Sequence, residues 1–148
     1  MNTSENSGIL SGAISGSLSG ALDPDSERAG EHADRYYKSV RRMTTDVKHI
    51  AKNTGFDERD IERIKNHLFK NIHDLGDGRT QRFDPDYEIS ETWRRLILGK
   101  GIQPHDIILL EHELLEIDYM EKGLSQSEAH ELTNQKYNYQ EALQKRKL

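Results

Sequence analysis

The chain has 148 residues and no cysteine, and its formal net charge is −5. The missing cysteines exclude disulfide bonds, thiolate metal sites and cysteine nucleophiles, and the acidic charge argues against long-range capture of DNA. No apolar run approaches the roughly 20 residues of a membrane span, so we expect no stable membrane span. Hydrophobic residues make up 33% of the chain, which predicts one small domain with a short extension.

A four-residue repeat occupies residues 7–22, with glycine at positions 8, 12, 16 and 20. On a helix this spacing aligns the glycines in one stripe, by which helices pack closely in membranes. Glycine costs about 1 kcal/mol at each helical position in water, so a flexible Gly/Ser-rich linker is favoured over a glycine zipper. The sequence therefore predicts a disordered or glycine-zipper segment over 1–24 and a helical domain over 25–148.

The spacing of apolar residues after Asp25 predicts an all-α fold, a compact bundle of five or six helices. Asp25 or Ser26 caps the first helix, whose period resumes after a break at 43–45. Asp57 caps a further helix, and one long loop follows it over about 73–83. Long loops in small domains are often functional.

Three further start signals occur in the second half of the chain. A helix begins at Asp84-Pro85, with proline at its first position. Another begins at Pro104. A capping box at Ser125 opens the last helix, which we expect to fray in the basic tail.

The helix that begins at Pro104 contains the most informative side chains. His105, His112 and Glu116 fall on one stripe at 100° per residue, beside apolar positions. Buried imidazoles and carboxylates need partners, so we expect them to converge on a metal, a substrate or one another.

The segment from His112 to Glu116 resembles the helical motif of zinc proteases, except that Glu116 replaces the second histidine. A carboxylate is also a zinc ligand, and His67, His73 or His130 is a candidate for a third. Candidate ligands of a divalent ion such as Zn²⁺ are His105, His112, Glu116 and His130. The alternative is a hydrogen-bonded pair of His112 and Glu116 one turn apart.

A second group of polar residues surrounds the predicted loop. His67 and His73 are candidates for the acid and base of RNA cleavage, in which the ribose 2′-hydroxyl is the nucleophile. Arg63, Arg79 and Arg82 are candidates for the cations that bind the phosphate. The alternative is a pair of surface histidines in a turn.

Eight short segments carry a resemblance to a known class of proteins. They are Thr45-Asp46-Val47, residues 50–55, residues 65–69, His73-Asp74-Leu75, residues 82–86, residues 93–96, His112-Glu113 and Ala129-His130. The region from Glu27 to Leu143 resembles a C-terminal effector module of bacterial polymorphic toxins, of the contact-dependent inhibition, RHS or phage head-associated type. Such modules are most often nucleases.

The resemblance implies a biological setting as well as an activity. A larger delivery protein would lie N-terminal to this module, with the Gly/Ser-rich segment as the junction. A cognate immunity protein would be its partner. The module would be secreted, or delivered into the cytoplasm of a target bacterium.

Two classes of function therefore remain. The first is a toxin hydrolase, in which a nuclease acting on RNA is favoured over a zinc metallopeptidase built on His112, Glu113 and Glu116. Its candidate catalytic residues are His67, His73, His112, Glu113 and Glu116. The second class is a non-catalytic helical module that binds another protein. Imidazoles that converge with Glu116 in a cleft would favour chemistry.

Overall fold

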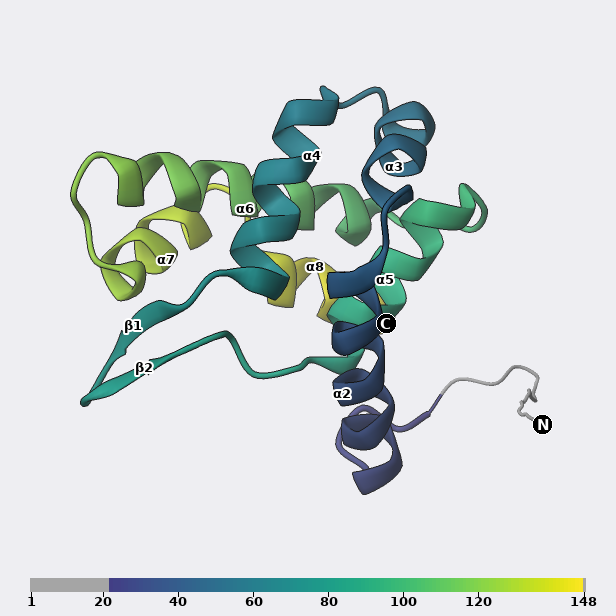
Figure 1. Cartoon of the computed structure of the whole chain (residues 1–148), viewed down its shortest axis with the longest axis horizontal. Coiled ribbons are helices and arrows are strands. Elements are labelled where there is room, and N and C mark those ends of the chain that lie inside the picture. The colour runs from purple at the N-terminus through teal and green to yellow at the C-terminus, as the bar shows by residue number, and fades with distance from the viewer. Residues whose placement is uncertain (1–21, 148) are drawn as a thin grey trace.

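The computed structural model describes residues 22–147. The expected linker or glycine zipper over 1–24 therefore lies outside the described residues, apart from residues 22–24. The elements are mostly helical (Figure 1), which confirms the all-α class: α2 (Glu27–Arg42), α3 (Asp46–Thr54), α4 (Glu58–Lys65), the π-helix η2 (Asn66–Lys70), β1 (His73–Gly76), β2 (Arg79–Gln81), α5 (Tyr87–Leu98), α6 (Pro104–Glu121), α7 (Gln126–Asn134) and α8 (Tyr139–Lys147).

Several helices begin where the sequence predicts. The Ser26 side chain accepts a hydrogen bond from the backbone N–H of Ala29 and caps α2. The Asp57 side chain caps α4 in the same way. Ser125 opens α7 with the expected capping box. Each side chain satisfies a backbone donor that a helix start leaves free.

The long loop predicted over 73–83 is instead largely a β-hairpin. β1 and β2 pair antiparallel, and His73 lies opposite Gln81. The turn between them places Asp77 at φ 52° and Gly78 at φ 76°, in the left-handed region that these residue types tolerate. The strands are too short and too polar to show the alternation by which a strand is recognised.

Two helix boundaries also differ from expectation. Asp86, not Asp84, caps α5, because its carboxylate accepts from the backbone N–H of Ile89, and Pro85 lies before the helix. Residues 135–138 divide the expected last helix into α7 and α8. The described chain therefore has seven α-helices rather than five or six.

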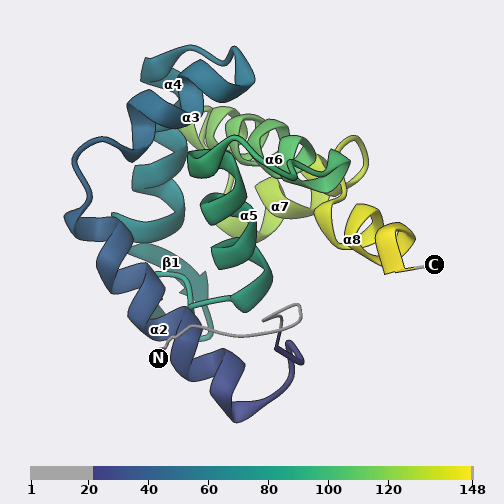
Figure 2. The same ribbon diagram turned by 90° about the vertical axis from the view of Figure 1, so that its right-hand side faces the viewer.

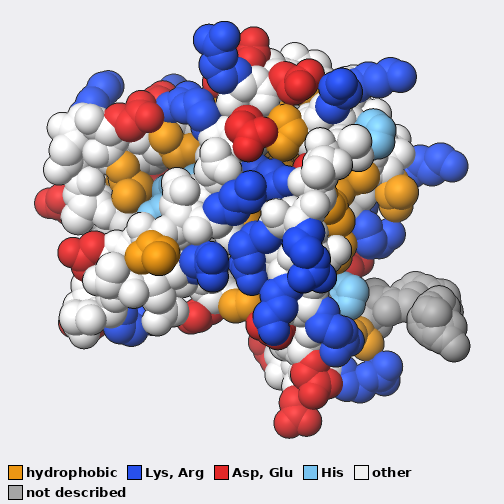
Figure 3. Space-filling model, in the orientation of Figure 1, with side chains coloured by type: hydrophobic (Ala, Val, Ile, Leu, Met, Phe, Trp, Pro, Cys, Tyr) orange, Lys and Arg blue, Asp and Glu red, His pale blue; other side chains and the backbone are white. Residues whose placement is uncertain are grey.

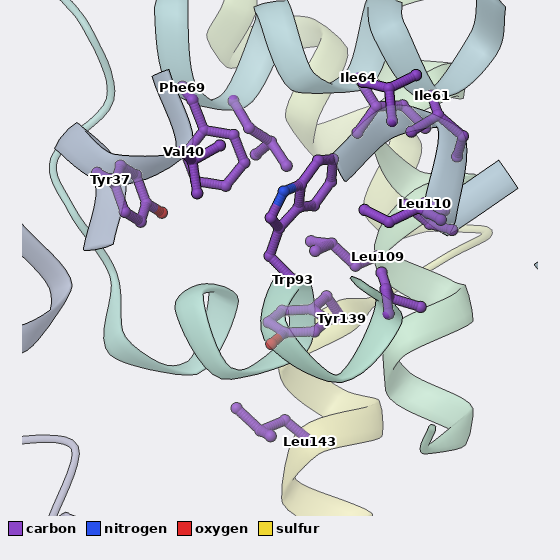
Figure 4. Close-up of a cluster of buried hydrophobic side chains, with 14 residues drawn as sticks. Tyr37, Val40, Ile61, Ile64, Phe69, Trp93, Leu109, Leu110, Tyr139 and Leu143 are labelled. Atoms are coloured by element: carbon purple, nitrogen blue, oxygen red, sulfur yellow. The ribbon is translucent and has the colours of Figure 1, made fainter. Parts of the chain in front are cut away.

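The hydrophobic core surrounds the fully buried Trp93 of α5 (Figure 4). The Phe69 ring packs edge-on against the indole, with 5.1 Å between the ring centroids. Leu109 of α6 and Tyr139 of α8 belong to the same cluster. In Figure 2, α5 runs through the middle of the molecule, with α2 on one side and α8 on the other. Within residues 22–147, no helix combines the length and the apolar character needed to cross a bilayer.

Two buried carboxylates connect the helices around this core. Asp46 accepts from the Lys65 ammonium at 2.9 Å and from the Trp93 indole at 3.2 Å, so it joins α3, α4 and α5. Asp106 accepts two hydrogen bonds from Arg95, both at 2.8 Å, and one from Thr92 at 2.7 Å. Asp106 thereby fixes the start of α6 against α5.

We expect Asp106→Asn to lower the free energy of unfolding by about 3 kcal/mol at neutral pH, because it leaves Arg95 without its buried counter-charge. Burial raises the pKa of Asp106, but the bonds from Arg95, Gln103 and Thr92 outweigh it and lower the pKa below the usual range. The stabilisation is therefore complete above about pH 4 and is lost as the pH falls through the lower folded-state pKa.

Urea unfolding at a series of pH values tests this expectation. The difference between wild type and Asp106→Asn should shrink as the pH falls below about 4. Asp118→Asn is the matched control, since Asp118 is an exposed residue of α6 paired with Arg63, and such pairs contribute less than about 1 kcal/mol. Equal destabilisation by both variants would contradict the role of Asp106.

Candidate metal centre

Three elements bring imidazole and carboxylate groups to one buried place. His112 and Glu116 lie one turn apart on α6 and are each only 2% exposed. His67 comes from η2 and His130 from α7, and both elements contact α6 (Figure 1). Glu113 lies beside them and is 6% exposed. Buried ionisable groups at this density need mutual compensation or a bound ion.

His112, Glu116 and His130 form a triangle of ligand atoms. Glu116 Oε1 lies 2.9 Å from His130 Nδ1 and 3.3 Å from His112 Nε2. The two imidazole nitrogens lie 3.3 Å apart. Ligand atoms about 2.0–2.1 Å from a tetrahedral Zn²⁺ lie about 3.3–3.4 Å from one another. The triangle therefore has nearly the dimensions of one face of a zinc coordination shell.

The tautomer of His112 suits metal binding through Nε2. Its Nδ1 lies 2.7 Å from the backbone oxygen of Tyr137. A carbonyl oxygen only accepts, so Nδ1 carries the proton and the lone pair of the neutral ring is on Nε2, which faces Glu116 and His130. A metal-binding histidine commonly donates its other N–H to a carbonyl or carboxylate in this way.

His67 reaches the same carboxylate from the opposite side. Its Nε2 lies 2.7 Å from Glu116 Oε2 and 3.5 Å from Glu113 Oε1. The wide turn of η2 places three consecutive side chains, His67, Leu68 and Phe69, in the interior. A regular α-helix does not direct three consecutive side chains to one face, and single π turns are frequent at functional sites.

The two carboxylates have opposite pKa shifts. Burial raises the pKa of Glu113, and the neighbouring charge of Glu116 raises it further. Burial also opposes the charge of Glu116, but its contacts with the imidazoles of His112, His130 and His67 outweigh burial and lower the pKa of Glu116. The hydrogen bond to Glu116 in turn raises the pKa of His130.

A cavity of about 420 Å³ opens onto this group. Glu113, Glu116 and His130 line it, together with Arg79 and Phe83 from the hairpin segment and Asp84 and Asp86 before α5. The side chain of His130 remains 51% exposed. A small group that enters the cavity therefore meets four carboxylates, one imidazole and one guanidinium.

The structure places His73 beside the centre rather than in it. Its Nε2 donates to the backbone oxygen of His67 at 2.8 Å, and its ring stacks on Phe83 at 4.3 Å. Burial lowers the pKa of His73. His67 points to Glu116 and His73 to a carbonyl, so the two imidazoles do not face a common substrate position as an acid and a base.

Three further candidate site residues, His105, Arg63 and Arg82, lie outside this group. His105 contacts Arg95, Asp106 and the Tyr139 ring. It shares the stripe of His112, but seven residues correspond to about 10 Å along a helix, so the expected grouping of these two ligands is wrong.

The two remaining arginines also have other partners. Arg63 forms ion pairs with Asp60, Asp118 and Glu121 at the surface. Arg82 donates to the backbone oxygen of Lys70. Of the three arginines predicted to bind substrate, Arg79 is the one that lines the cavity.

Two features of the site escaped sequence reasoning. The Tyr137 carbonyl orients His112, yet a backbone group has no residue type by which to recognise it. Phe83 packs against both His67 and His73, at 5.3 and 4.3 Å between ring centroids. The sequence feature that could have pointed to Phe83 is its position between Arg82 and Asp84.

Comparison with known proteins gave no match to a family model, to a curated protein or to a solved structure. The arguments about function therefore depend on the geometry of the site.

We expect Zn²⁺ to raise the melting temperature of the protein by about 5–10 °C. An ion at 100 times its dissociation constant stabilises the folded state by about 2.7 kcal/mol, and each kcal/mol corresponds to about 2–4 °C at this chain length. Thermal melting with and without Zn²⁺, followed by addition of a chelator, measures the shift. Mg²⁺ should produce little shift, because imidazole ligands favour zinc.

His130→Ala should reduce the shift while the protein stays folded, because half of this side chain is already exposed. His49→Ala is the matched control, since His49 is an exposed histidine of α3. A shift of undiminished size in His130→Ala would place the bound ion away from His130.

Proposed function

We propose that this chain is a metal-dependent hydrolase that binds Zn²⁺ through His112, Glu116 and His130 and acts as the toxin effector of a bacterial competition system. The observation that carries the proposal is the triangle of two imidazole nitrogens and one carboxylate oxygen with sides of 2.9, 3.3 and 3.3 Å. Two of its members, Glu116 and His130, line the cavity, so a bound ion would lie beside a substrate in that cavity.

The number of ligands favours catalysis over a structural role. Structural zinc sites have four protein ligands, whereas catalytic sites have three and keep one position open for water or substrate. A zinc ion in such a site supplies hydroxide near neutral pH and polarises the bond to be broken. The triangle has three members, and its exposed member, His130, lies on the side of the cavity.

Arg79 in the cavity lining and a cationic surface over α2 and η2 support a nucleic-acid substrate, and RNA is the one we propose. Arg79 lines the cavity itself. Lys and Arg side chains gather over η2 and α2 on the face shown in Figure 3. Arg82 and Arg41 bind neighbouring backbone oxygens there, those of Lys70 and Phe69. Phosphate contacts dominate nucleic-acid affinity, so a local cationic surface serves even a chain of net charge −5.

A metallopeptidase is the second candidate function. The order His112-Glu113-x-x-Glu116 favours it, since a glutamate follows the first ligand directly as in zinc proteases. Both candidates use the same centre and differ in the bond that is cleaved. The substrate assay below separates them.

The resemblance of residues 27–143 to polymorphic-toxin effectors supports the biological part of the proposal. Under it, a larger protein delivers this module into a target bacterium, and a cognate immunity protein protects the producing cell. An immunity protein that covers the cavity would block the centre directly.

We expect expression of the full chain in bacteria to arrest growth and His130→Ala to abolish the arrest at a matched soluble level. Loss of one ligand should reduce hydrolysis by more than about 100-fold, since even outer partners of metal ligands contribute 10–100-fold. Total RNA, DNA and protein from arrested cells would identify the substrate, and degraded RNA is the expected result. His49→Ala should remain as toxic as wild type.

The purified protein gives the matching test in vitro. RNA cleavage should stop on addition of a chelator and return with Zn²⁺. Cleavage that survives the chelator would refute metal dependence. Degraded protein with intact RNA would establish the peptidase, and a folded, harmless wild type without any hydrolytic activity would favour a binding module.

A further inference from the structure

We infer that the centre binds two metal ions, with Glu116 as a bridging carboxylate and with His67 and Glu113 as the other ligands of the second ion. This inference rests on the proposed function and extends it. The first ion occupies the triangle of His112, His130 and Glu116. The second ion occupies a separate group of ligand atoms around His67.

The two oxygens of Glu116 have different partners. Oε1 lies 2.9 Å from His130 Nδ1 and 3.3 Å from His112 Nε2. Oε2 lies 2.7 Å from His67 Nε2. The carboxylate therefore presents one oxygen to the histidines of α6 and α7 and the other to the histidine of η2.

The second group is less regular than the first, with His67 Nε2 2.7 Å from Glu116 Oε2 and 3.5 Å from Glu113 Oε1. His67, Glu113 and Glu116 each offer one ligand atom, and these atoms lie within 4.8 Å of one another. All three residues are buried. Each group thus offers three protein ligands, as catalytic metal sites do.

Glu113 supplies an independent argument for a second ion. Its side chain is buried, and no hydrogen bond to its carboxylate is found among residues 22–147; the nearest imidazole nitrogens are His67 Nε2 at 3.5 Å and His112 Nε2 at 3.9 Å. A carboxylate that no protein donor occupies, and that lies beside a second carboxylate and an imidazole, is available as a ligand of a divalent ion.

The formal charges of the site are compatible with two divalent ions. Glu113 and Glu116 contribute two negative charges when ionised, and neutral imidazoles contribute none. One divalent ion balances the carboxylates. A second makes the centre cationic, which favours an anionic substrate and a metal-bound hydroxide.

Two ions also define the substrate class more narrowly. Paired ions about 3.5–4 Å apart stabilise both the attacking and the leaving oxygen of an in-line displacement. In phosphodiester hydrolysis, the water oxygen forms the new bond to phosphorus, the ester P–O bond breaks, and the leaving alcohol takes the proton that the water loses. Arg79 at the rim of the cavity is available to the non-bridging phosphate oxygens.

Metal stoichiometry tests the inference without reference to activity. The full chain is dialysed against Zn²⁺ and washed, and zinc per chain is measured by elemental analysis. We expect two ions in wild type and one in Glu113→Gln, because an amide is a poor zinc ligand of almost the same shape. Asp118→Asn, which removes a carboxylate from an exposed position of α6, should retain two.

A second variant and a spectroscopic signal guard against a folding artefact. His67→Gln preserves an N–H donor for Glu116 and should also bind one ion. Wild type loaded with Mn²⁺ should show the paramagnetic resonance of a coupled pair, and Glu113→Gln should show that of an isolated ion.

The outcomes separate the two proposals. One zinc in wild type that is lost in His130→Ala would overturn the second ion and keep the proposed one-metal hydrolase. Two ions in both wild type and Glu113→Gln would also overturn this inference. No bound zinc in folded wild type would overturn both proposals.

Discussion

The arrangement of helices around the centre depends on one buried charge, the carboxylate of Glu116. A carboxylate that is 2% exposed is stable only when several donors or cations replace its water. Those partners come from η2 and α7 as well as from α6 itself. Because α7 contacts α6 and the hairpin, a single compensated charge fixes how these elements meet.

A separate hydrogen-bond network fixes the opposite end of α6. Asp106 is bound by Arg95 and Thr92 of α5, and Tyr139 of α8 contacts Thr92 in turn. His105 belongs to this second network. Two compensated carboxylates, separated along one helix, thus serve different purposes. Asp106 already has a bidentate arginine, whereas the partners of Glu116 are imidazoles, which are also common metal ligands.

The sequence predicted those parts of the site that depend on local periodicity. His112 and Glu116 are one turn apart and therefore share a face of α6, and the capping box that opens α7 places His130 at the centre of that helix. His67 could not be assigned in the same way, because its direction depends on a π turn that no residue type signals. The grouping of His105 with His112 failed for a geometric reason: periodicity gives the face of a helix but not the position along it.

The hairpin connects the candidate metal centre to the surface of the molecule. His73 of β1 donates to the backbone of His67, and Phe83 after β2 stacks on His73 and meets the His67 ring at its edge. The segment that carries Arg79 over the cavity is therefore packed against a ligand of the centre. A displacement of the hairpin would move the guanidinium and the imidazole together. The proposed substrate contact at Arg79 and the position of His67 therefore depend on the same aromatic packing around Phe83.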